Sequence, residues 1–428
     1  MYKNTYLCNI VLLLFTNYKL QIHLHLVVYI CKLTIDYLCF LPFINMISQL
    51  KLLNENREDS LKNRYVCNDD IMPLLDTLKS HFKVSIVGYS VKKRPVFSVT
   101  LGSGPKKILI WSQMHGNETT TTKALFDIFN YFKLNNNVGT SILQSCTMTV
   151  IPILNPDGAS LYTRLNANNI DLNRDAQDLS QPESLILDRI YKLLRPDFCF
   201  NLHGQRTIFS AGNTRYPATI SFLAPSQNFE KTITHNRKLA MQLIARMNQS
   251  LQSIIPLQVG LYDDAFNLNC VGDTFQSKNT PTILIEAGHY HRDYRREHVR
   301  KFICVAILEG LSCIAKEAVS GQSFDDYFKI PLNKKLFFDV IIRNTKEKTG
   351  NQSNDIGIQF KEVLIDNTIN FIPIIKTIGN LSRFYGHYEI DANFLSVTGK
   401  YKEQLQVGSE NDFVLINNEL FALKPDNY

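Results

Sequence analysis

The chain of 428 residues lacks a Cys-x-x-Cys pair, an internal repeat and any long low-complexity stretch. Its nine cysteines are scattered and odd in number, which argues against a disulfide framework and favours reduced thiols in an intracellular protein. Because 45% of the residues are hydrophobic and 20% are charged, the chain can bury a large core. We therefore expect a cytoplasmic protein with one sizeable domain and a smaller one.

Clustered charge of one sign is also absent, since the net charge of +7 is mild and spread along the chain. Short basic patches occur at Lys92–Arg94, Arg292–Arg300 and Lys334–Lys335. Solvated surface explains them better than nucleic-acid binding, which uses a concentrated basic face. No nucleic-acid partner is expected.

Residues 1–45 lack the uninterrupted apolar run of about 18 residues that a membrane-spanning helix needs. They are rich in Leu, Ile, Tyr, Phe and Cys, but polar residues interrupt every run, and no small-residue cleavage site closes an apolar core. Three interpretations stay open: translated upstream sequence that is absent from the functional protein, which we favour; a membrane anchor; or a packed extension. Membrane contact is expected only if the segment is an anchor, in which case the protein is membrane-bound and not cytoplasmic.

Between residues 46 and 325, four short apolar runs of strand type each end in polar residues. Segments with helical spacing lie between them, and this alternation predicts an α/β fold with a mixed, mostly parallel sheet and helices on both faces. Open sheets of this kind bind ligands at the carboxyl ends of their strands. The runs span Lys107–Trp111, Thr147–Leu154, Asp197–His203 and Pro281–Glu286, and the helical segments span 119–132, 183–194, 229–251 and 295–318.

His115 and Glu118 follow the first run, three residues apart. A short loop that leaves a strand can direct an imidazole and a carboxylate toward one point, which supplies two thirds of a catalytic zinc site. A surface turn would explain this pair as well if it stood alone. His203 ends another run, where a histidine is more often a core residue than a ligand. Glu286 is harder to explain structurally, because an unpaired buried carboxylate costs several kcal/mol without a nearby metal or cation.

The second run leads to Asn155-Pro-Asp-Gly158, a turn signal in which Pro fixes φ and Gly permits a left-handed exit. A turn does not explain Arg164 and Arg174 in the polar loop that follows, with Asn173 beside the second arginine. Guanidinium and amide donors at these positions can hold a carboxylate through paired hydrogen bonds. The alternative is a solvated basic loop.

These ordered motifs resemble the zinc metallocarboxypeptidase superfamily, the carboxypeptidase A-like enzymes, over roughly residues 70–320. The resemblance implies that one zinc ion per chain is bound by His115, Glu118 and His203, and that Asp171 supports the first histidine. Two neutral imidazoles and one carboxylate leave zinc with a net positive charge and an open position, which lowers the pKa of bound water toward about 7.

The same resemblance implies roles for the other polar residues. Asn173 and Arg174 would bind the terminal carboxylate of the substrate, and Arg164 would polarise the scissile carbonyl. Glu286 would be the general base. Tyr262 is the counterpart of a family tyrosine that hydrogen-bonds the substrate from a mobile loop, although a loop tyrosine without that role fits its spacing equally well.

The spacing of nine residues between Arg164 and Asn173 resembles the bacterial branch with a short loop, whose members include carboxypeptidases and amidases of murein peptides. Asn168 and Asn169 stand where that branch has Arg-Gly, and Asn169 can replace Gly because Asn tolerates the left-handed conformation. Asp175, which follows the second arginine, also departs from the pattern and leaves the substrate preference open.

In the family, the residue before a loop aspartate lines the pocket for the cleaved side chain. If Asp273 is that aspartate, Gly272 would leave a roomy, uncharged pocket floor.

Beyond about residue 325 the helical period fades, and strands separated by Asn, Asp and Gly clusters are expected. They predict a small β domain over residues 326–428, after a catalytic domain over residues 46–325. The expected strands are Leu336–Ile342, Ile356–Ile365, Phe371–Ile378, Arg383–Ile390 and Phe413–Leu423.

Three hypotheses for the function remain. The leading one is a zinc carboxypeptidase or a murein-peptide amidase that acts on a peptide or peptide-like substrate with a free carboxylate. The alternative enzyme resembles the desuccinylases and aspartoacylases, which hydrolyse N-acyl amino acids and carry an appended β domain. The third is a binding module that kept the fold and lost catalysis, against which the presence of Glu286 argues.

Overall fold

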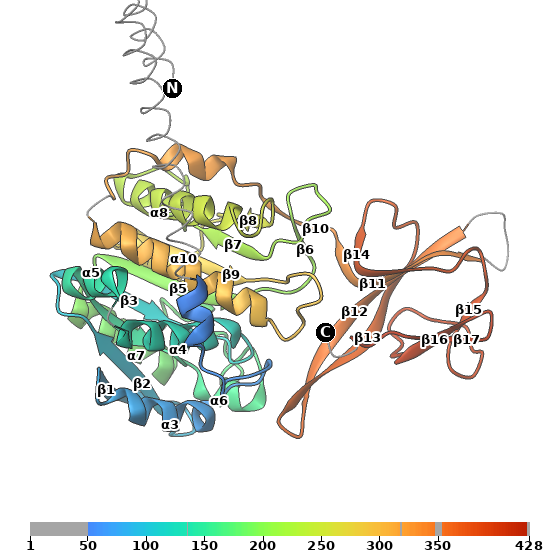
Figure 1. The fold of residues 1–428 in the computed structure, drawn as a ribbon, viewed down its shortest axis with the longest axis horizontal. Helices are drawn as coiled ribbons and strands as arrows, with labels where there is room; N and C mark the ends of the chain where they lie inside the picture. Colours follow the sequence, from blue (N-terminus) through green and yellow to red (C-terminus); the bar gives the residue numbers. More distant parts are fainter. Residues whose placement is uncertain (1–49, 135, 317–318, 347–352, 426–428) are drawn as a thin grey trace, which may run out of the picture. The chain divides into compact units, whose positions relative to one another are not determined.

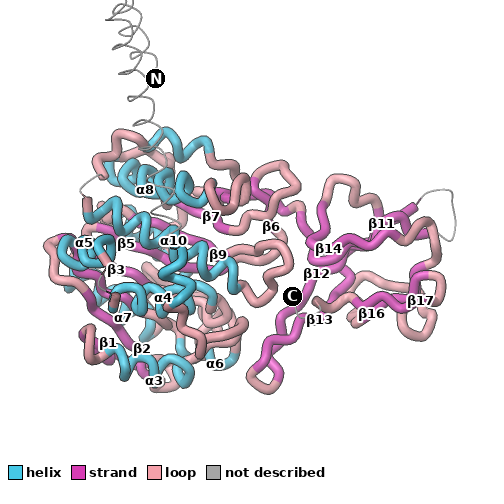
Figure 2. The backbone as a smooth tube through the Cα atoms, viewed as in Figure 1, coloured by secondary structure: helices cyan, strands magenta, loops and turns pink. Residues whose placement is uncertain are grey.

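The computed structural model describes residues 50–134, 136–316, 319–346 and 353–425. The expectations for residues 1–45 lie outside this part of the chain. Leu53–Tyr428 forms one compact unit. Helices and strands alternate up to residue 315, and strands predominate after it (Figure 2).

An eight-stranded mixed sheet lies at the centre of the unit (Figure 1). Four of its adjacent pairs are parallel, and the four predicted apolar runs are consecutive neighbours in it, which confirms the expected sheet. In spatial order the strands are β1 (Lys83–Tyr89), β2 (Pro95–Leu101), β4 (Cys146–Ile151), β3 (Lys106–Trp111), β5 (Phe198–Gly204), β9 (Thr282–Ala287), β7 (Ile220–Leu223) and β8 (Val259–Leu261).

Helices cover both faces of this sheet, as expected. Successive side chains of β5 point to opposite faces. Cys199 belongs to the buried cluster that contains Leu187 and Phe275, whereas Phe200 packs against Gly310 on the other face. The helices are α3 (Asn68–Leu78), α4 (Thr120–Lys133), α5 (Asn137–Ser145), α6 (Pro156–Leu161), α7 (Pro182–Leu194), α8 (His235–Gln252), α9 (Val271–Ser277) and α10 (Glu297–Ala315).

The helix expected at 229–251 begins later, at His235. The side chain of Thr234 accepts a hydrogen bond from the backbone N–H of Arg237 and so caps the first turn of α8. Residues 229–234 are therefore loop, although their hydrophobic spacing continues that of the helix.

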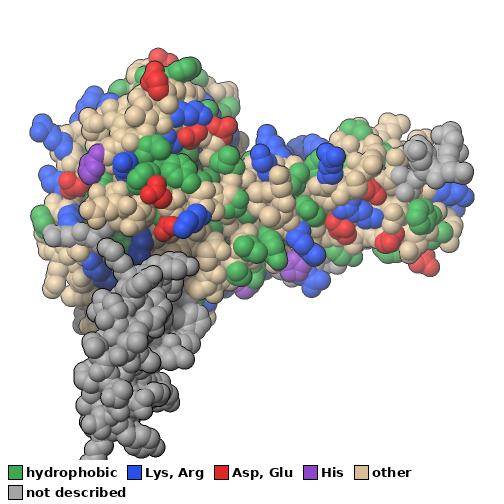
Figure 3. All heavy atoms as spheres, turned by 90° about the horizontal axis from the view of Figure 1, so that it is seen from above, with side chains coloured by type: hydrophobic (Ala, Val, Ile, Leu, Met, Phe, Trp, Pro, Cys, Tyr) green, Lys and Arg blue, Asp and Glu red, His purple; other side chains and the backbone are tan. Residues whose placement is uncertain are grey.

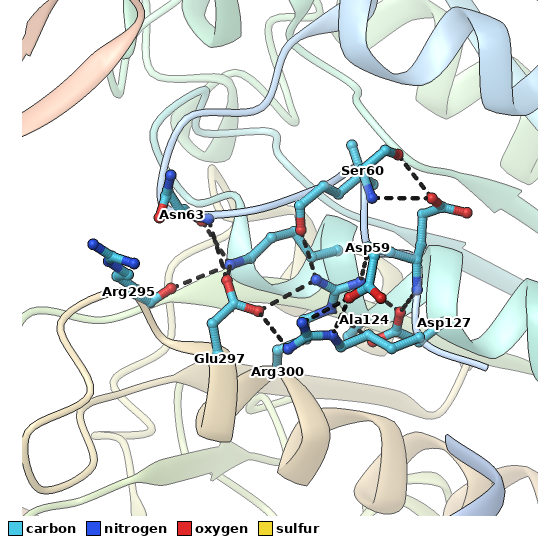
Figure 4. A network of polar contacts seen from close by, with 12 residues as sticks. Asp59, Ser60, Asn63, Ala124, Asp127, Arg295, Glu297 and Arg300 are labelled. Atoms are coloured by element: carbon cyan, nitrogen blue, oxygen red, sulfur yellow. Dashed lines mark hydrogen bonds and ion pairs between the residues drawn. The ribbon is translucent and has the colours of Figure 1, made fainter. Parts of the chain in front are cut away.

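A buried ion pair joins α4 to α10 (Figure 4). Arg300 donates to the two carboxylate oxygens of Asp127, at 2.6 and 2.5 Å, and also to the backbone carbonyls of Glu58 and Leu61. Arg296 and Arg300 are buried, whereas Arg292 and Arg295 are exposed, so the interpretation of Arg292–Arg300 as solvated surface is wrong for Arg296 and Arg300. Periodicity and charge do not reveal a basic residue that turns inward to an acidic partner on another helix.

The same network contains Glu297 (Figure 4). Glu297 forms an ion pair of 2.6 Å with Lys123. Lys123 also donates to the backbone carbonyl of Asn63. The two ion pairs thereby fix the loop of residues 58–63 on the two helices and position the next residue, Arg64.

The C-terminal β region, residues 333–425, begins with β10 (Asn333–Lys335), which pairs with β6 (Phe209–Ala211). Two small sheets follow, in agreement with the expected β-rich region. One has the order β13 (Thr368–Gly379), β12 (Ser353–Ile365), β11 (Phe337–Lys346), β14 (Tyr385–Asp391), and the other β15 (Val397–Thr398), β16 (Phe413–Ile416), β17 (Glu419–Ala422).

The single strand expected over Phe413–Leu423 is instead the hairpin of β16 and β17. Its turn is Asn417–Asn418, and both residues have a positive φ. Asparagine adopts this left-handed conformation more readily than most residues, which makes the pair a turn signal that hydrophobicity alone conceals.

On the face that Figure 3 shows, basic and acidic side chains are interspersed, which fits a solvated surface. Within the described ranges, no helix combines the length and the apolar character needed to cross a bilayer. Six cysteines of the same ranges are free thiols: Cys67, Cys146, Cys199, Cys270, Cys304 and Cys313.

Candidate metal centre and its cavity

The carboxyl ends of β3, β5 and β9 meet at one edge of the sheet, because the three strands are parallel neighbours. His203 on β5 lies opposite Glu286 on β9 in the strand register. The loop after β3 brings His115 and Glu118 to the same edge. The structure thus gathers four residues whose sequence positions span 171 residues (115 to 286).

His115, Glu118 and His203 present donor atoms to a common point. The two Nδ1 atoms of the histidines are 3.2 Å apart, and each lies 2.9 Å from one carboxylate oxygen of Glu118. Ligand atoms at 2.0–2.1 Å from a tetrahedral zinc are about 3.3 Å apart. The three side chains therefore fit a metal ion with little rearrangement.

Asp171 orients the ring of His115 through Nε2, the ring nitrogen that does not face Glu118. Its Oδ1 lies 3.0 Å from Nε2 of His115 and also accepts the backbone N–H of Asn173. A proton on Nε2 leaves the lone pair of Nδ1 free for a cation, which is the usual arrangement behind a metal-binding histidine. Burial lowers the pKa of His115, but the charge of Glu118 and the hydrogen bond to Asp171 outweigh it and raise the pKa to about 9.

Glu118 is oriented by the backbone N–H of Gly204, which donates to its Oε2 at 3.0 Å. Burial alone would raise the pKa of Glu118, but the adjacent His115 and His203 hold it well below its ordinary value. The carboxylate is therefore ionised at neutral pH, as a metal ligand has to be.

Glu286 differs from Glu118 in having a buried carboxylate oxygen, Oε2, without a hydrogen-bond partner in the structure. Burial, followed by repulsion from the charge of Glu118, raises the pKa of Glu286 well above its ordinary value. A cation and a water molecule between the two carboxylates would reduce both the cost of burying the charged form of Glu286 and its repulsion from Glu118.

Two sequence motifs pack directly against each other beside this cluster. A Cβ on Gly116 would lie 2.0 Å from the backbone of Gly158, so the loop after β3 can approach α6 only through glycine. Asn155 caps α6 by accepting the N–H of Gly158. The turn with a left-handed glycine that we expected at Asn155–Gly158 is therefore wrong: these residues begin a helix, and the left-handed residue is Tyr162, at φ 54°.

Arg164, Asn173 and Arg174 all line the cavity that contains the metal cluster. Arg164 is half-exposed and forms an ion pair of 3.0 Å with Asp171. Asn173 is fixed by accepting the backbone N–H of Val271, and Arg174 is exposed. Free guanidinium donors at the cavity edge are available to an anionic ligand.

The departures from the family pattern around this loop have structural roles. Asn169 has φ 60°, as expected from its replacement of glycine. Asn168 donates to the side chain of Gln181. Asp175 is buried and accepts hydrogen bonds from Ser180 and from the backbone of Gln181, so it does not face the cavity.

The cavity has a volume of about 870 Å³ and extends to Tyr262, Gly272 and Asp273. Tyr262 is half-buried, and burial together with the charges of Glu286 and Glu118 raises the pKa of its hydroxyl. Gly272 contributes no side chain to the floor, whereas burial raises the pKa of the neighbouring Asp273 to about 7.

Several cavity residues were not anticipated from the sequence. Arg64 and Arg296 are buried arginines of the wall, and Glu362 and Phe371 come from the C-terminal β region. No local pattern identifies them, because each reaches the cavity through tertiary contacts. In this part of the chain the sequence predicted only a strand over Ile356–Ile365.

Part of the chain is similar to known carboxypeptidases. The family model described as zinc carboxypeptidase matches residues 71–188, which include His115, Glu118 and the arginine loop. A protein named "Probable carboxypeptidase 2" from Trichophyton verrucosum is 26% identical over 191 residues, which are 43% of this chain and 34% of that protein. "Carboxypeptidase SOL1" of Arabidopsis thaliana is 29% identical over 167 residues, which are 34% of each chain. The chain thus spans about a third of the length of these relatives.

Among solved structures, the Shewanella denitrificans OS-217 protein designated carboxypeptidase A superimposes with a TM-score of 0.50 at 18% identity, over 58% of this chain and 69% of that one. Together with the strand order, this establishes a carboxypeptidase-like α/β fold, with a separate C-terminal β-sheet region.

Proposed function

We propose that the protein is a zinc-dependent hydrolase that removes the C-terminal residue from a peptide, as a metallocarboxypeptidase or a murein-peptide amidase. The observation that carries this proposal is the cluster of His115, Glu118 and His203, with donor atoms 2.9–3.2 Å apart, beside the unpartnered carboxylate oxygen of Glu286. The match of residues 71–188 to the zinc carboxypeptidase family supports it.

The three ligands would hold one zinc ion, which supplies Lewis acidity and lowers the pKa of a bound water. Glu286 takes a proton from the attacking water at its free oxygen and delivers it to the leaving amine. Its unpartnered Oε2 beside the cluster is suited to both steps, because a carboxylate oxygen without a hydrogen-bond partner can accept a proton and return it.

The arginines determine which end of the peptide is cleaved. Arg174 and Asn173, at the cavity edge, bind the terminal carboxylate of the substrate. Arg164, within 3.4 Å of the Glu118 carboxylate, is placed to stabilise negative charge that develops on the scissile carbonyl. A substrate without a free carboxylate would lose the first of these contacts.

A panel of peptides that vary in the last residue tests the proposal by mass spectrometry. We expect loss of a single C-terminal residue from free-acid peptides, much slower trimming of C-terminally amidated ones, and inhibition by a zinc chelator. N-succinyl and N-acetyl amino acids belong in the same panel. Release of succinate or acetate, without peptide trimming, would assign the site to N-acyl amino acid hydrolysis instead.

A further inference from the structure

The cavity of the metal cluster is lined by two separate parts of the chain. Most lining residues come from the α/β part, but the long hairpin of β12 and β13 contributes a set of its own: Gln359, Phe360, Glu362 and Phe371.

Three of these residues lie on one face of the hairpin. Phe360 and Glu362 are two positions apart on β12, so their side chains point the same way, and Phe371 is the register partner of Glu362 on β13. Lys361, between them on β12, is exposed and does not line the cavity. We call Phe360, Glu362 and Phe371 the hairpin wall.

Buried polar contacts hold the hairpin wall in place. Arg64 forms an ion pair of 2.9 Å with Glu362, and the hydroxyl of Tyr162 donates to the same carboxylate oxygen. The ring of Tyr294 contacts both phenylalanines, with centroid distances of 5.2 Å to Phe360 and 5.4 Å to Phe371. The wall is thus packed on the α/β part and is not a free loop.

A second anchor lies close to a predicted zinc ligand. Gln359 donates to the hydroxyl of Thr207 at 2.6 Å, and Nε2 of His387 lies 2.8 Å from the carbonyl of Thr207. Thr207 is four residues beyond His203. The β region therefore adjoins the cavity wall that holds the metal cluster.

We call Asn173 and Arg174, which are proposed to bind the terminal carboxylate, the carboxylate clamp. Different hydrogen bonds connect the hairpin wall and the carboxylate clamp to the metal cluster. The hydroxyl of Thr119, next to Glu118, donates to the backbone carbonyl of Arg64, which in turn holds Glu362. The backbone N–H of Asn173 instead donates to Asp171, and the side-chain oxygen of Asn173 accepts the backbone N–H of Val271 in α9. Because Arg174, the cluster and the hairpin wall line one cavity, a peptide whose terminal carboxylate is bound at Arg174 can contact all three.

The charge and the apolar surface of the hairpin wall determine which groups of a ligand it can contact. Burial raises the pKa of Glu362, but the charges of Arg64 and Arg296 outweigh it and keep the carboxylate ionised and compensated. The two half-buried phenylalanine rings remain as the surface available to a ligand. Aromatic faces favour aromatic and apolar side chains.

We propose that the hairpin wall is a substrate subsite of the β region, which binds an aromatic or apolar side chain on the amino-terminal side of the cleaved bond. This inference rests on the proposed peptidase function. The β region then contributes to substrate selection and not only to stability.

The test compares Phe371→Ala with the matched control Lys361→Ala on acetylated tripeptides that carry Phe, Gly or Lys one or two positions before the last residue. In wild type and the control, we expect Phe to be preferred over Gly in kcat/KM. In Phe371→Ala this preference should fall by about tenfold, in line with the loss of an apolar contact in a pocket. Phe371→Leu, which keeps apolar bulk, should retain most of it. Equal preferences in all four proteins would overturn the proposal.

A binding readout keeps the test separate from the proposed reaction. A tripeptide with p-benzoylphenylalanine at the preferred position is photo-crosslinked to Glu286→Gln protein, and the site is mapped by mass spectrometry. We expect the crosslink within β12 or β13. A crosslink only in the α/β part would overturn the subsite, whereas a wild type that trims no peptide would instead refute the proposed function.

Discussion

The orientation of His115 in the site depends on the partners of its two ring nitrogens. Its Nε2 is engaged by Asp171, so its Nδ1 faces Glu118 and His203. The sequence could supply the residue types, but not the 3.2 Å separation of the two Nδ1 atoms. The loop that holds His115 reaches this position because Gly116 has no side chain and packs directly on α6.

The role of Glu286 is testable by removing its basicity while keeping its size. In Glu286→Gln we expect kcat to fall by roughly 10² to 10⁴, because a general base is lost. Zinc content should stay the same, since the three ligands are untouched. Loss of metal from this variant would make Glu286 a ligand, and unchanged turnover with metal present would exclude it as the base.

The carboxylate clamp is testable at Arg174. An ammonium cannot reproduce the two parallel hydrogen bonds of a guanidinium, so Arg174→Lys should raise KM for free-acid peptides by roughly tenfold or more. Steady-state kinetics on free-acid peptides and on any amidated peptide that is slowly cleaved give the comparison. Equal losses on both substrate types would mean that Arg174 serves the fold or the reaction centre.

At the scale of elements, long apolar runs were predictable and short strands were not. β3 and β9 are recognisable because they are buried on both faces and read as continuous apolar sequence. β6 has three residues and exists through its pairing with β10, more than a hundred residues later. Long-range pairing of this kind leaves no local pattern.

The ion pair between α4 and α10 gives a prediction at this scale. Arg300→Met keeps the length of the side chain but leaves Asp127 as an uncompensated buried charge, so the free energy of unfolding should fall by about 3–5 kcal/mol. Urea denaturation measures the change. Lys79→Ala, which breaks an exposed pair with Asp76, is the control and should have little effect. Equal stability of the two variants would contradict a structural role for the buried pair.

At the scale of the whole molecule, the sequence indicated a β region but not its contribution to the cavity. Arg64 and Glu362 are separated by 298 positions, and neither has a distinctive sequence context. The boundary at residues 325 and 326 stays a prediction. The contacts of Thr207 and Tyr294 with the β region indicate that the two parts are stable together.

The burial of His387, which contacts Thr207, makes stability depend on pH. Burial and the nearby charge of Arg296 lower the pKa of His387 from 6.5 to about 4, against the hydrogen bond to Thr207. The folded protein therefore prefers the neutral ring, and this contribution to stability is complete above pH 6.5 and is lost as the pH falls toward 4.

Replacing His387 tests this dependence. His387→Gln keeps a donor for the carbonyl of Thr207 but cannot be protonated. Between pH 7 and pH 4.5, the Tm of the wild type should fall more than that of the variant. Parallel Tm profiles would show that His387 does not control the acid response.

The zinc content of the purified protein tests the proposed metal centre most directly. Inductively coupled plasma mass spectrometry on the purified protein, after zinc loading and dialysis, should find one zinc per chain. The exposed His298 provides the control: His298→Ala should keep that zinc, whereas His203→Ala should lose it, because two ligands are too few for tight binding. A wild type without bound zinc, or a His203→Ala protein that keeps it, would contradict the proposed metal centre.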